Sequence, residues 1–455
     1  MHLDRLTHVF KNNPDDKGRY ILYWMQQSQR VKYNHALAHA IKLANQFNLP
    51  LMVVFVVTEH FLSANERHYT FMFEGLVEVK RGVEEQGATF VIKIGQFSDV
   101  IPKLASEAHS VVFDYGYLKP QLNWRREVLD KIVAANLKTN IDLVESDLIV
   151  PIRRAYNKVA YGAYVIRPHL QKLAPQYRDF IDSGKLKNIS LISVKSDVNI
   201  DDLSFIQSLN IDHSVKKSNY FTGGYSHAKK HLQTFIDTKL SFYPQRSDPS
   251  LGVQSYLSLY LQFGQISSLE VLDIIESLNL DIEVKKEFVE QLLVRRELAY
   301  NYVFYNKNYD NFLYMTEPWA YETMKIHQHD QREFIYTKEE IENGETEDIY
   351  FNSAMMEMKK TGFMANYMRM YWAKQIITWL QSYEEAYDLI VELNNKYFID
   401  GRNPNSYVNI AWCFGKMDRP WPERSVWGKL RSMNDKGLKK KFNIDEYVKQ
   451  IQNLK

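Results

Sequence analysis

The sequence predicts a doubly wound α/β domain with a parallel sheet, followed by an all-α domain. Before about residue 150, short β-rich runs alternate with helical patterns, which indicates strands joined by crossover helices. From about residue 216, strand signals nearly vanish and helical periodicity takes over. The 455 residues exceed what one hydrophobic core usually supports. We therefore expect an α/β domain over residues 1–175, a connection over 176–215 and a helical domain over 216–455.

The expected strands are mostly apolar on both faces, as in a parallel sheet that is covered on both sides. They are Tyr20–Met25, Leu51–Val57, Thr89–Ile94, Ser110–Tyr115 and Ile141–Val144. Helical patterns lie between them, over Asn34–Phe47 and Arg67–Gln86. No GxGxxG follows the first strand, so the usual dinucleotide-binding fingerprint is absent.

Composition leaves the function class open. A net charge of +2 neither demands nor excludes a nucleic-acid partner. The single cysteine, Cys413, excludes an internal disulfide and a cysteine-based metal cluster, and we expect no metal. The start of the chain lacks the apolar core of a signal peptide, and no run approaches the ~18 apolar residues of a membrane span. We expect an intracellular protein with no membrane partner.

The stretch Thr361–Leu380, TGFMANYMRMYWAKQIITWL, combines a cation with two indoles. As a helix it would place Arg369, Trp372, Ile376 and Trp379 close to one face. A plain apolar core rarely includes arginine beside tryptophan. The face therefore predicts a partner, although tryptophans at this spacing also occur in ordinary core packing.

Four segments, in this order and spacing, resemble the class II cyclobutane pyrimidine dimer photolyases of the photolyase/cryptochrome superfamily. They are YWMQQSQRVKYNHAL from Tyr23, RSDPSLGVQSYLSLYLQFGQIS from Arg246, FVEQLLVRRELAYNYVFYNKNYD from Phe288, and the run from Thr361 through LNNKYFIDGRNPNSY to GKLRSMNDKGLKKKF. The resemblance implies light-dependent DNA repair, in which reduced anionic FAD passes an electron to a pyrimidine dimer and recovers it. It also implies an α/β domain of the antenna type, without identifying an antenna chromophore.

The resemblance assigns a set of residues to FAD. Small and hydroxylated residues before a helix suit its diphosphate, because a helix N-terminus has free N–H groups, although a simple helix cap would have the same pattern. Arg369, paired with Asp400, would stabilise the anionic flavin, and Asn394 would meet flavin N5. The full set is Tyr243, Gln254, Ser255, Leu257, Ser258, Asn366, Arg369, Asn394, Asp400 and Asn405. Leu259 and Gln262 stand where the family usually has Pro and His.

A second set would bind the lesion in DNA. By resemblance, Glu297 faces the thymine carbonyls and Arg431 enters the gap that the flipped dimer leaves in the duplex. From spacing alone, a salt bridge between Glu297 and a neighbouring arginine is equally compatible. The remaining members are Tyr300, Asn301, Met370 and Trp412, and Lys439, Lys440 and Lys441 are candidates for phosphate contacts.

Two tryptophans are candidates for light-driven reduction of the flavin. Trp372 matches the flavin-proximal member of the family's electron relay, and Trp379 lies two helical turns away. The next member of the relay falls on Phe351, which is too hard to oxidise for this role. Tyr350 or Trp379 would then have to provide a bypass.

Two other functions compete with dimer repair. A cryptochrome-like photoreceptor would bind flavin without repairing DNA, but it would not need Glu297, Met370, Trp412 and Arg431. Repair of the pyrimidine–pyrimidone photoproduct uses a histidine where this chain has Ala365. We therefore expect a monomeric lyase that acts on dimer-containing DNA.

Overall fold

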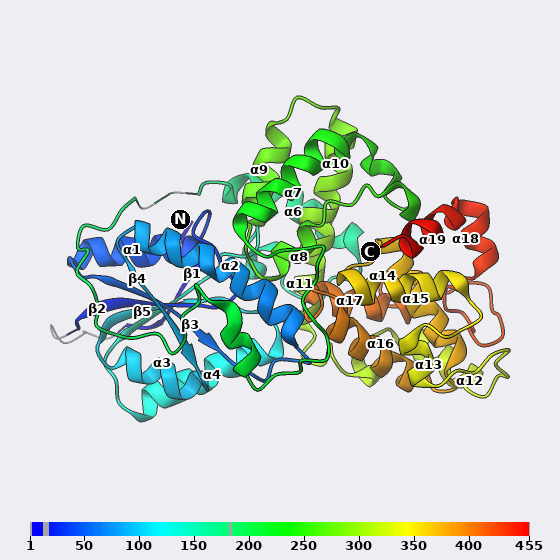
Figure 1. Ribbon diagram of the computed structural model, residues 1–455, viewed down its shortest axis with the longest axis horizontal. Coiled ribbons are helices and arrows are strands. Elements are labelled where there is room, and N and C mark those ends of the chain that lie inside the picture. The colour runs from blue at the N-terminus through cyan, green and yellow to red at the C-terminus, as the bar shows by residue number, and fades with distance from the viewer. Residues whose placement is uncertain (1, 12–17, 181, 183, 455) are drawn as a thin grey trace.

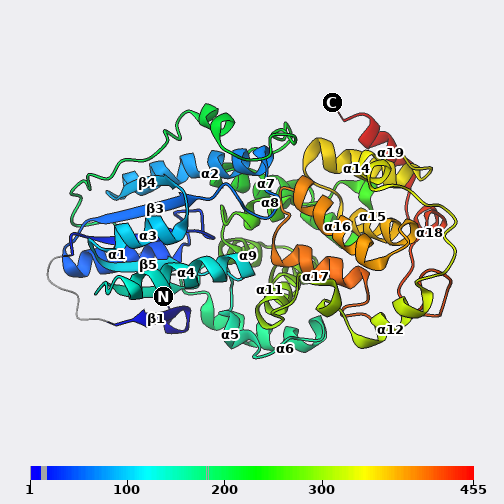
Figure 2. The same ribbon diagram turned by 90° about the horizontal axis from the view of Figure 1, so that it is seen from below.

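The structure is a computed structural model that describes residues 2–11, 18–180, 182 and 184–454. An α/β part and a helical part lie side by side along the longest axis, as Figures 1 and 2 show. The six-stranded sheet has the order β1-β6-β5-β2-β3-β4. Its parallel strands are β2 (Tyr20–Met25), β3 (Leu51–Val57), β4 (Thr89–Ile94), β5 (Ala108–Asp114) and β6 (Asn140–Val144). The predicted fold class is confirmed.

The first strand of the sheet was not predicted. β1 (Leu6–Phe10) pairs with β6 in the antiparallel direction and forms one edge of the sheet. Its residues are exposed or half-buried, so the strand lacks the apolar run that made the others visible. An antiparallel edge strand on a parallel sheet is common in α/β folds.

Helices cover both faces of the sheet. Alternate residues of β2 point to opposite faces: Ile21 and Tyr23 belong to one core cluster, and Leu22 and Trp24 belong to another. The helices on the first face are α1 (His35–Phe47) and α2 (Glu66–Glu85), and those on the second are α3 (Phe97–Ala105) and α4 (Lys119–Ala134).

The connection between the two parts runs along the outer edge of β4. Asp197 N donates to Ile92 O over 2.9 Å, and Ile94 N donates to the Asp197 carboxylate over 2.9 Å. The segment contains one short 3₁₀ turn, Leu203–Ser208. It thus covers strand-edge groups that would otherwise be open to pairing with another chain.

The helical part contains two groups of helices. The first comprises α5 (Ile152–Ala155), α6 (Ala163–Leu173), α7 (Tyr225–Thr238), α8 (Leu257–Gln262), α9 (Ser268–Ser277), α10 (Ile282–Val289) and α11 (Arg296–Tyr305). The second comprises α12 (Pro318–His327), α13 (Lys338–Asn343), α14 (Ile349–Thr361), α15 (Asn366–Trp379), α16 (Tyr383–Tyr397), α17 (Pro404–Cys413), α18 (Asp435–Lys441) and α19 (Ile444–Gln452). Among the described residues, no helix is long and apolar enough to cross a membrane.

The stretch Thr361–Leu380 is not one continuous helix. α14 ends at Thr361, and Gly362 has a φ of 82°, a left-handed conformation that ends helices. A Cβ at this position would lie 2.7 Å from Ile399. α15 begins at Asn366, so the arginine and both tryptophans still share one helix.

Candidate functional site

Arg369 of α15 forms a two-point ion pair with Asp400. Its two terminal nitrogens donate to the two carboxylate oxygens over 3.0 and 3.2 Å, and its Nε donates to Met364 O. The guanidinium also lies 4.1 Å from the ring centre of Phe398. The Asp400 side chain is 5% exposed and the Arg369 side chain 25%. One part of this cation therefore remains free to meet a ligand.

The asparagines assigned to the flavin surround the same segment. Asn394 is buried and donates to the side chain of Asn395 over 3.0 Å. Asn403 caps α17 by accepting from the backbone of Asn405, and it donates to Asp400 O over 2.7 Å. Asn366 is exposed at the start of α15. The side chain of Asn403 thus links Asp400 to the start of α17.

The segment before α8 contains polar groups that lack partners. The buried Nε2 of Gln254 has no hydrogen-bond partner among the described residues. Ser255 Oγ accepts from Leu257 N over 3.4 Å, and Ser258 is exposed. A buried amide donor without an acceptor is costly. This observation fits a ligand that supplies an acceptor here, as a phosphate oxygen would.

Lys239 adds a cation that sequence reasoning missed. Its Nζ donates to Gln254 O over 3.3 Å and lies 4.8 Å from the ring centre of Tyr256. The lysine forms no ion pair within the described part of the chain, and burial lowers its pKa. An anionic group beside Gln254 would supply the missing counter-charge. Tyr243 packs nearby against Phe288.

Glu297 of α11 is buried at the seam where this helix meets the segment that follows β6. Its carboxylate accepts from Ile149 N over 2.6 Å and from Val150 N over 3.2 Å. Burial raises the pKa of this carboxyl to about 8, so it carries a proton at neutral pH. The salt bridge that spacing allowed is not formed, because Arg296 pairs with Asp147 and Arg295 pairs with Glu290.

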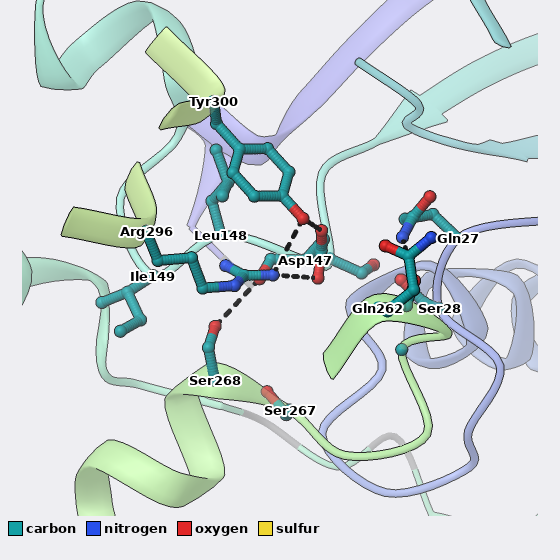
Figure 3. Close-up of polar contacts among 12 residues, drawn as sticks. Gln27, Ser28, Asp147, Leu148, Ile149, Gln262, Ser267, Ser268, Arg296 and Tyr300 are labelled. Carbon is teal, nitrogen blue, oxygen red and sulfur yellow. Dashed lines mark hydrogen bonds and ion pairs between the residues drawn. The ribbon is translucent and has the colours of Figure 1, made fainter. Parts of the chain in front are cut away.

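Two more lesion candidates are anchored at the same seam. Tyr300 donates to Asp147 over 2.7 Å, as Figure 3 shows. Asn301 accepts from Ala160 N over 2.8 Å and donates to Lys158 O over 2.9 Å. Both side chains are buried. These partners all lie within residues 147–160, so in this structure Tyr300 and Asn301 hydrogen-bond to the protein itself. Contact of the two side chains with DNA stays a prediction.

The other lesion candidates lie in the second helical group. Met370 and Trp412 are half-buried, and Arg295 lies 5.9 Å from the ring centre of Trp412. Arg431 lies over the exposed Trp421 at 5.3 Å. Lys439, Lys440 and Lys441 are exposed on α18.

The tryptophans of α15 have different surroundings. Trp372 is 2% exposed, and its Nε1 donates to Met355 Sδ over 2.9 Å. Trp379 packs edge-on against Phe351 at 4.7 Å and against Tyr336 at 5.0 Å. The Phe351 ring therefore contacts the Trp379 ring directly. Tyr350 instead donates to Asp445 over 2.7 Å.

A pocket, which we call the interdomain pocket, opens at the carboxyl ends of β2 and β3. Ligands commonly bind at such strand ends in open α/β sheets. Its walls come from both parts of the molecule and comprise Met25, Phe55, Val57, Phe61, Tyr69, Met72, Phe97, Tyr117, Trp124, Phe263, Tyr300 and Pro404, with further residues between them. Sequence reasoning missed this pocket, although the glutamines after the first strand, in WMQQSQ, were a usable signal.

Glutamine amides form the polar side of the interdomain pocket. Gln121 Nε2 donates to Gln27 Oε1 over 2.6 Å, and Gln27 Nε2 donates to Gln262 O over 3.0 Å. The buried Oε1 of Gln29 has no partner among the described residues. The pocket thus combines aromatic walls with free amide groups, which suits a planar heteroaromatic ligand.

Arg402 is the cation of the interdomain pocket. It is 1% exposed, with a φ of 58°, and it forms no ion pair within the described ranges. Its guanidinium donates to the backbone carbonyls of Asn395 and Ile399, and burial lowers its pKa to about 9. It also lies 2.9 Å from the ring Nε2 of His68. An anionic ligand group would relieve the cost of burying this charge.

Comparisons with known proteins agree with the fold and with the sequence segments. The profile of the DNA photolyase family matches residues 21–185. The deoxyribodipyrimidine photo-lyase of Methanothermobacter thermautotrophicus is 38% identical, with 100% of this chain and 99% of the relative aligned. That of Potorous tridactylus is 34% identical over 96% of this chain and 82% of the relative.

Among solved structures, a bacterial class III photolyase from Agrobacterium tumefaciens has the same fold. Its TM-score is 0.75 at 18% identity, and the match covers 96% of this chain and 86% of the other. The family expected from the sequence is therefore confirmed by relatives that align over nearly the whole chain. This chain belongs to the deoxyribodipyrimidine photo-lyase family of DNA photolyases.

Proposed function

We propose that this protein repairs cyclobutane pyrimidine dimers in DNA under light, with FAD held between Arg369 and the segment before α8. The bidentate Arg369–Asp400 pair carries the proposal, because its cation is partly exposed while its carboxylate is buried. The unpartnered Gln254 amide and the unpaired Lys239 support a phosphate-bearing cofactor at the other end. When bound, FAD would supply the photoexcited electron that splits the dimer.

The residues of this chain would provide charge, orientation and exclusion of water. Arg369 offers a fixed cation for the anionic flavin, and Asp400 fixes its orientation by two hydrogen bonds. Met370 and Trp412 would form apolar walls for the extruded bases. Glu297, with a proton at neutral pH, would donate a hydrogen bond to a base carbonyl if lesion binding opens the seam.

The direct test is repair itself. Reduced protein is illuminated with a dimer-containing oligonucleotide under anaerobic conditions, and recovery of base absorbance is followed. We expect recovery that depends on both light and reduction. No recovery with fully reduced, flavin-loaded protein would refute repair and favour a receptor function.

We also propose that the interdomain pocket binds a second, anionic chromophore. Arg402 and the amides of Gln27 and Gln29 would hold its charged and polar groups, and the aromatic walls would stack on its ring system. The absorption spectrum of the purified protein tests this, because an antenna adds bands beyond those of flavin. A spectrum of flavin alone after purification from a cell that makes such chromophores would contradict it.

A further inference from the structure

The segment over residues 414–433 is a long loop between α17 and α18. Within it, the only strand pairing that the structure describes is an isolated bridge between Arg424 and Gly428. Met417 and Val426 have left-handed φ angles of 59° and 69°. Loops of this length without helices or strands are uncommon in compact domains and are often functional. This one carries Arg431, the candidate for insertion into the duplex.

Two consecutive side chains of α15 bind the two ends of this loop. Lys374 Nζ donates to the carbonyl of Cys413, immediately before the loop. Gln375 Nε2 donates to the carbonyl of Met433, at the other end, over 3.0 Å. The two side chains are only 4% and 7% exposed. One turn of α15 therefore holds both ends of the loop.

The surroundings of Lys374 are unusual for a lysine. Its ammonium lies 5.0 Å from the ring centre of Trp427 and has no ion-pair partner among the described residues. Burial lowers its pKa to about 8, Cys413 and Asp418 oppose this shift, and Arg431 reinforces it. A buried cation without a carboxylate is costly. The carbonyls at the end of α17 offer it the negative end of a helix dipole.

The elements that meet at Lys374 carry the residues that we propose as walls of the lesion pocket, Met370 and Trp412. Met370 lies one turn earlier on α15, and Arg369 precedes it. Trp412, on the opposite wall, immediately precedes Cys413 at the end of α17. Displacement of either hydrogen bond would thus shift the loop relative to both walls.

We propose that Lys374 and Gln375 are positioning residues that hold the loop 414–433 in register with the lesion pocket, so that Arg431 enters the duplex where the dimer leaves it. This inference rests on the proposed repair function. It predicts that the pair matters for extrusion of a dimer from duplex DNA and is dispensable where no extrusion is needed.

The test compares Lys374→Met and Gln375→Met with the wild type and with Lys449→Met, a control at an exposed lysine of α19. For each protein, affinity is measured for dimer-containing and undamaged duplexes, together with the fluorescence of a base analogue beside the dimer. We expect Lys374→Met to lose about tenfold in discrimination, the effect of one hydrogen bond from a charged donor, and Gln375→Met, which loses a neutral donor, to lose about threefold to tenfold. Repair of a dimer in single-stranded DNA and flavin content should stay at the wild-type level.

Two further measurements separate positioning from general stability. Wild-type discrimination should fall as the pH rises through about 8, where Lys374 loses its charge, and Lys374→Met should show no such fall. Lys374→Arg keeps a cation and a donor. If Lys374→Met does not fold, this second variant should retain part of the wild-type discrimination.

Several outcomes would overturn the inference. Unchanged duplex discrimination in both clamp variants would do so, as would equal losses on single-stranded and duplex DNA. Failure of the wild type to repair dimers in both single-stranded and duplex DNA would instead refute the proposed function itself. The two failures are therefore distinguishable.

Discussion

Two arginines meet at one short segment, residues 400–404, and they are partnered differently: Arg369 of α15 binds Asp400, and Arg402 belongs to the segment itself. Arg369 forms a bidentate pair with the buried carboxylate of Asp400. Arg402 is fully buried, bonds only to carbonyls and a histidine ring nitrogen, and lines the interdomain pocket. The first cation is neutralised by the protein, and the second is not.

This difference indicates different kinds of ligand. A flavin changes its charge as it is reduced, so a cation beside it must also be stable when the flavin is neutral. The Asp400 carboxylate would balance the charge of Arg369 in that state. A ligand whose negative charge is permanent would offset the cost of burying a cation, such as Arg402, that no carboxylate balances. The flavin site therefore suits a redox cofactor, whereas the interdomain pocket suits a constant anion.

The largest expected effect comes from Arg369→Ala. Removing the arginine leaves the Asp400 carboxylate buried and unpaired, which costs about 3–5 kcal/mol. We expect purified protein with little flavin, measured as the ratio of flavin to protein absorbance. Arg369→Lys, which keeps the charge but loses the fork, should retain an intermediate amount. A fully yellow Arg369→Ala protein would count against the assigned role.

The second prediction tests whether the anionic flavin beside Arg369 can be formed by light. Trp372→Phe should abolish photoreduction of oxidised flavin, because phenylalanine is hard to oxidise, while chemically reduced protein should still repair. Phe351→Trp should accelerate photoreduction, since residue 351 already packs against Trp379. Transient absorption measures both. Unchanged photoreduction in Trp372→Phe would mean that the electron enters elsewhere.

The third prediction concerns Arg402→Met. Replacing an unpaired buried cation with an apolar side chain should leave stability unchanged or raise it. Flavin content should stay at the wild-type level, and any second chromophore should be lost. Thermal unfolding and absorption spectra measure these quantities. Loss of flavin together with the second chromophore would show that residues 400–404 do not separate the two sites.

The smallest effect is a pH dependence from Glu297, a carboxylate that is buried without a direct ion pair. Its pKa is raised from the ordinary 4.5 to about 8 in the folded state, so the folded state retains a proton that the unfolded state has lost. Its contribution to stability is thus full below pH 4.5 and is lost as the pH rises to about 8. The free energy of unfolding of Glu297→Gln, measured by urea titration, should decline less over this interval than that of the wild type, by at most a few kcal/mol. Parallel curves would show that Glu297 is already ionised at neutral pH.

The sequence allowed good prediction of the parallel strands and of the division into α/β and helical parts. The five predicted strands are present within two residues of their expected bounds. β1 was missed because its side chains are largely solvated. The break after α14 was also missed, although Gly362 is the residue that a helix end favours.

The contacts of the site residues were predicted less completely than the fold. The Arg369–Asp400 contact follows from family resemblance and is present in the structure. Lys239, Arg402 and Lys374 gave no signal, because a lysine or arginine in a helical pattern normally indicates a solvated face. The salt bridge that spacing allowed for Glu297 is not formed, and the sequence did not indicate its hydrogen bonds to the backbone of residues 149–150. Contact of Glu297 with the lesion stays a prediction.

By itself, the sequence determined the order of most helices and strands and the family, and it predicted the residues that would hold FAD. These depend on periodicity, on turn residues and on motifs, all of which act between near neighbours in the chain. Only the tertiary structure decided which charges are buried and what neutralises them. Arg402 meets His68, Lys374 meets Cys413, and Gln375 meets Met433, all through contacts between distant segments. Burial and charge pairing depend on how distant segments pack together, which the spacing of residues within one segment does not specify.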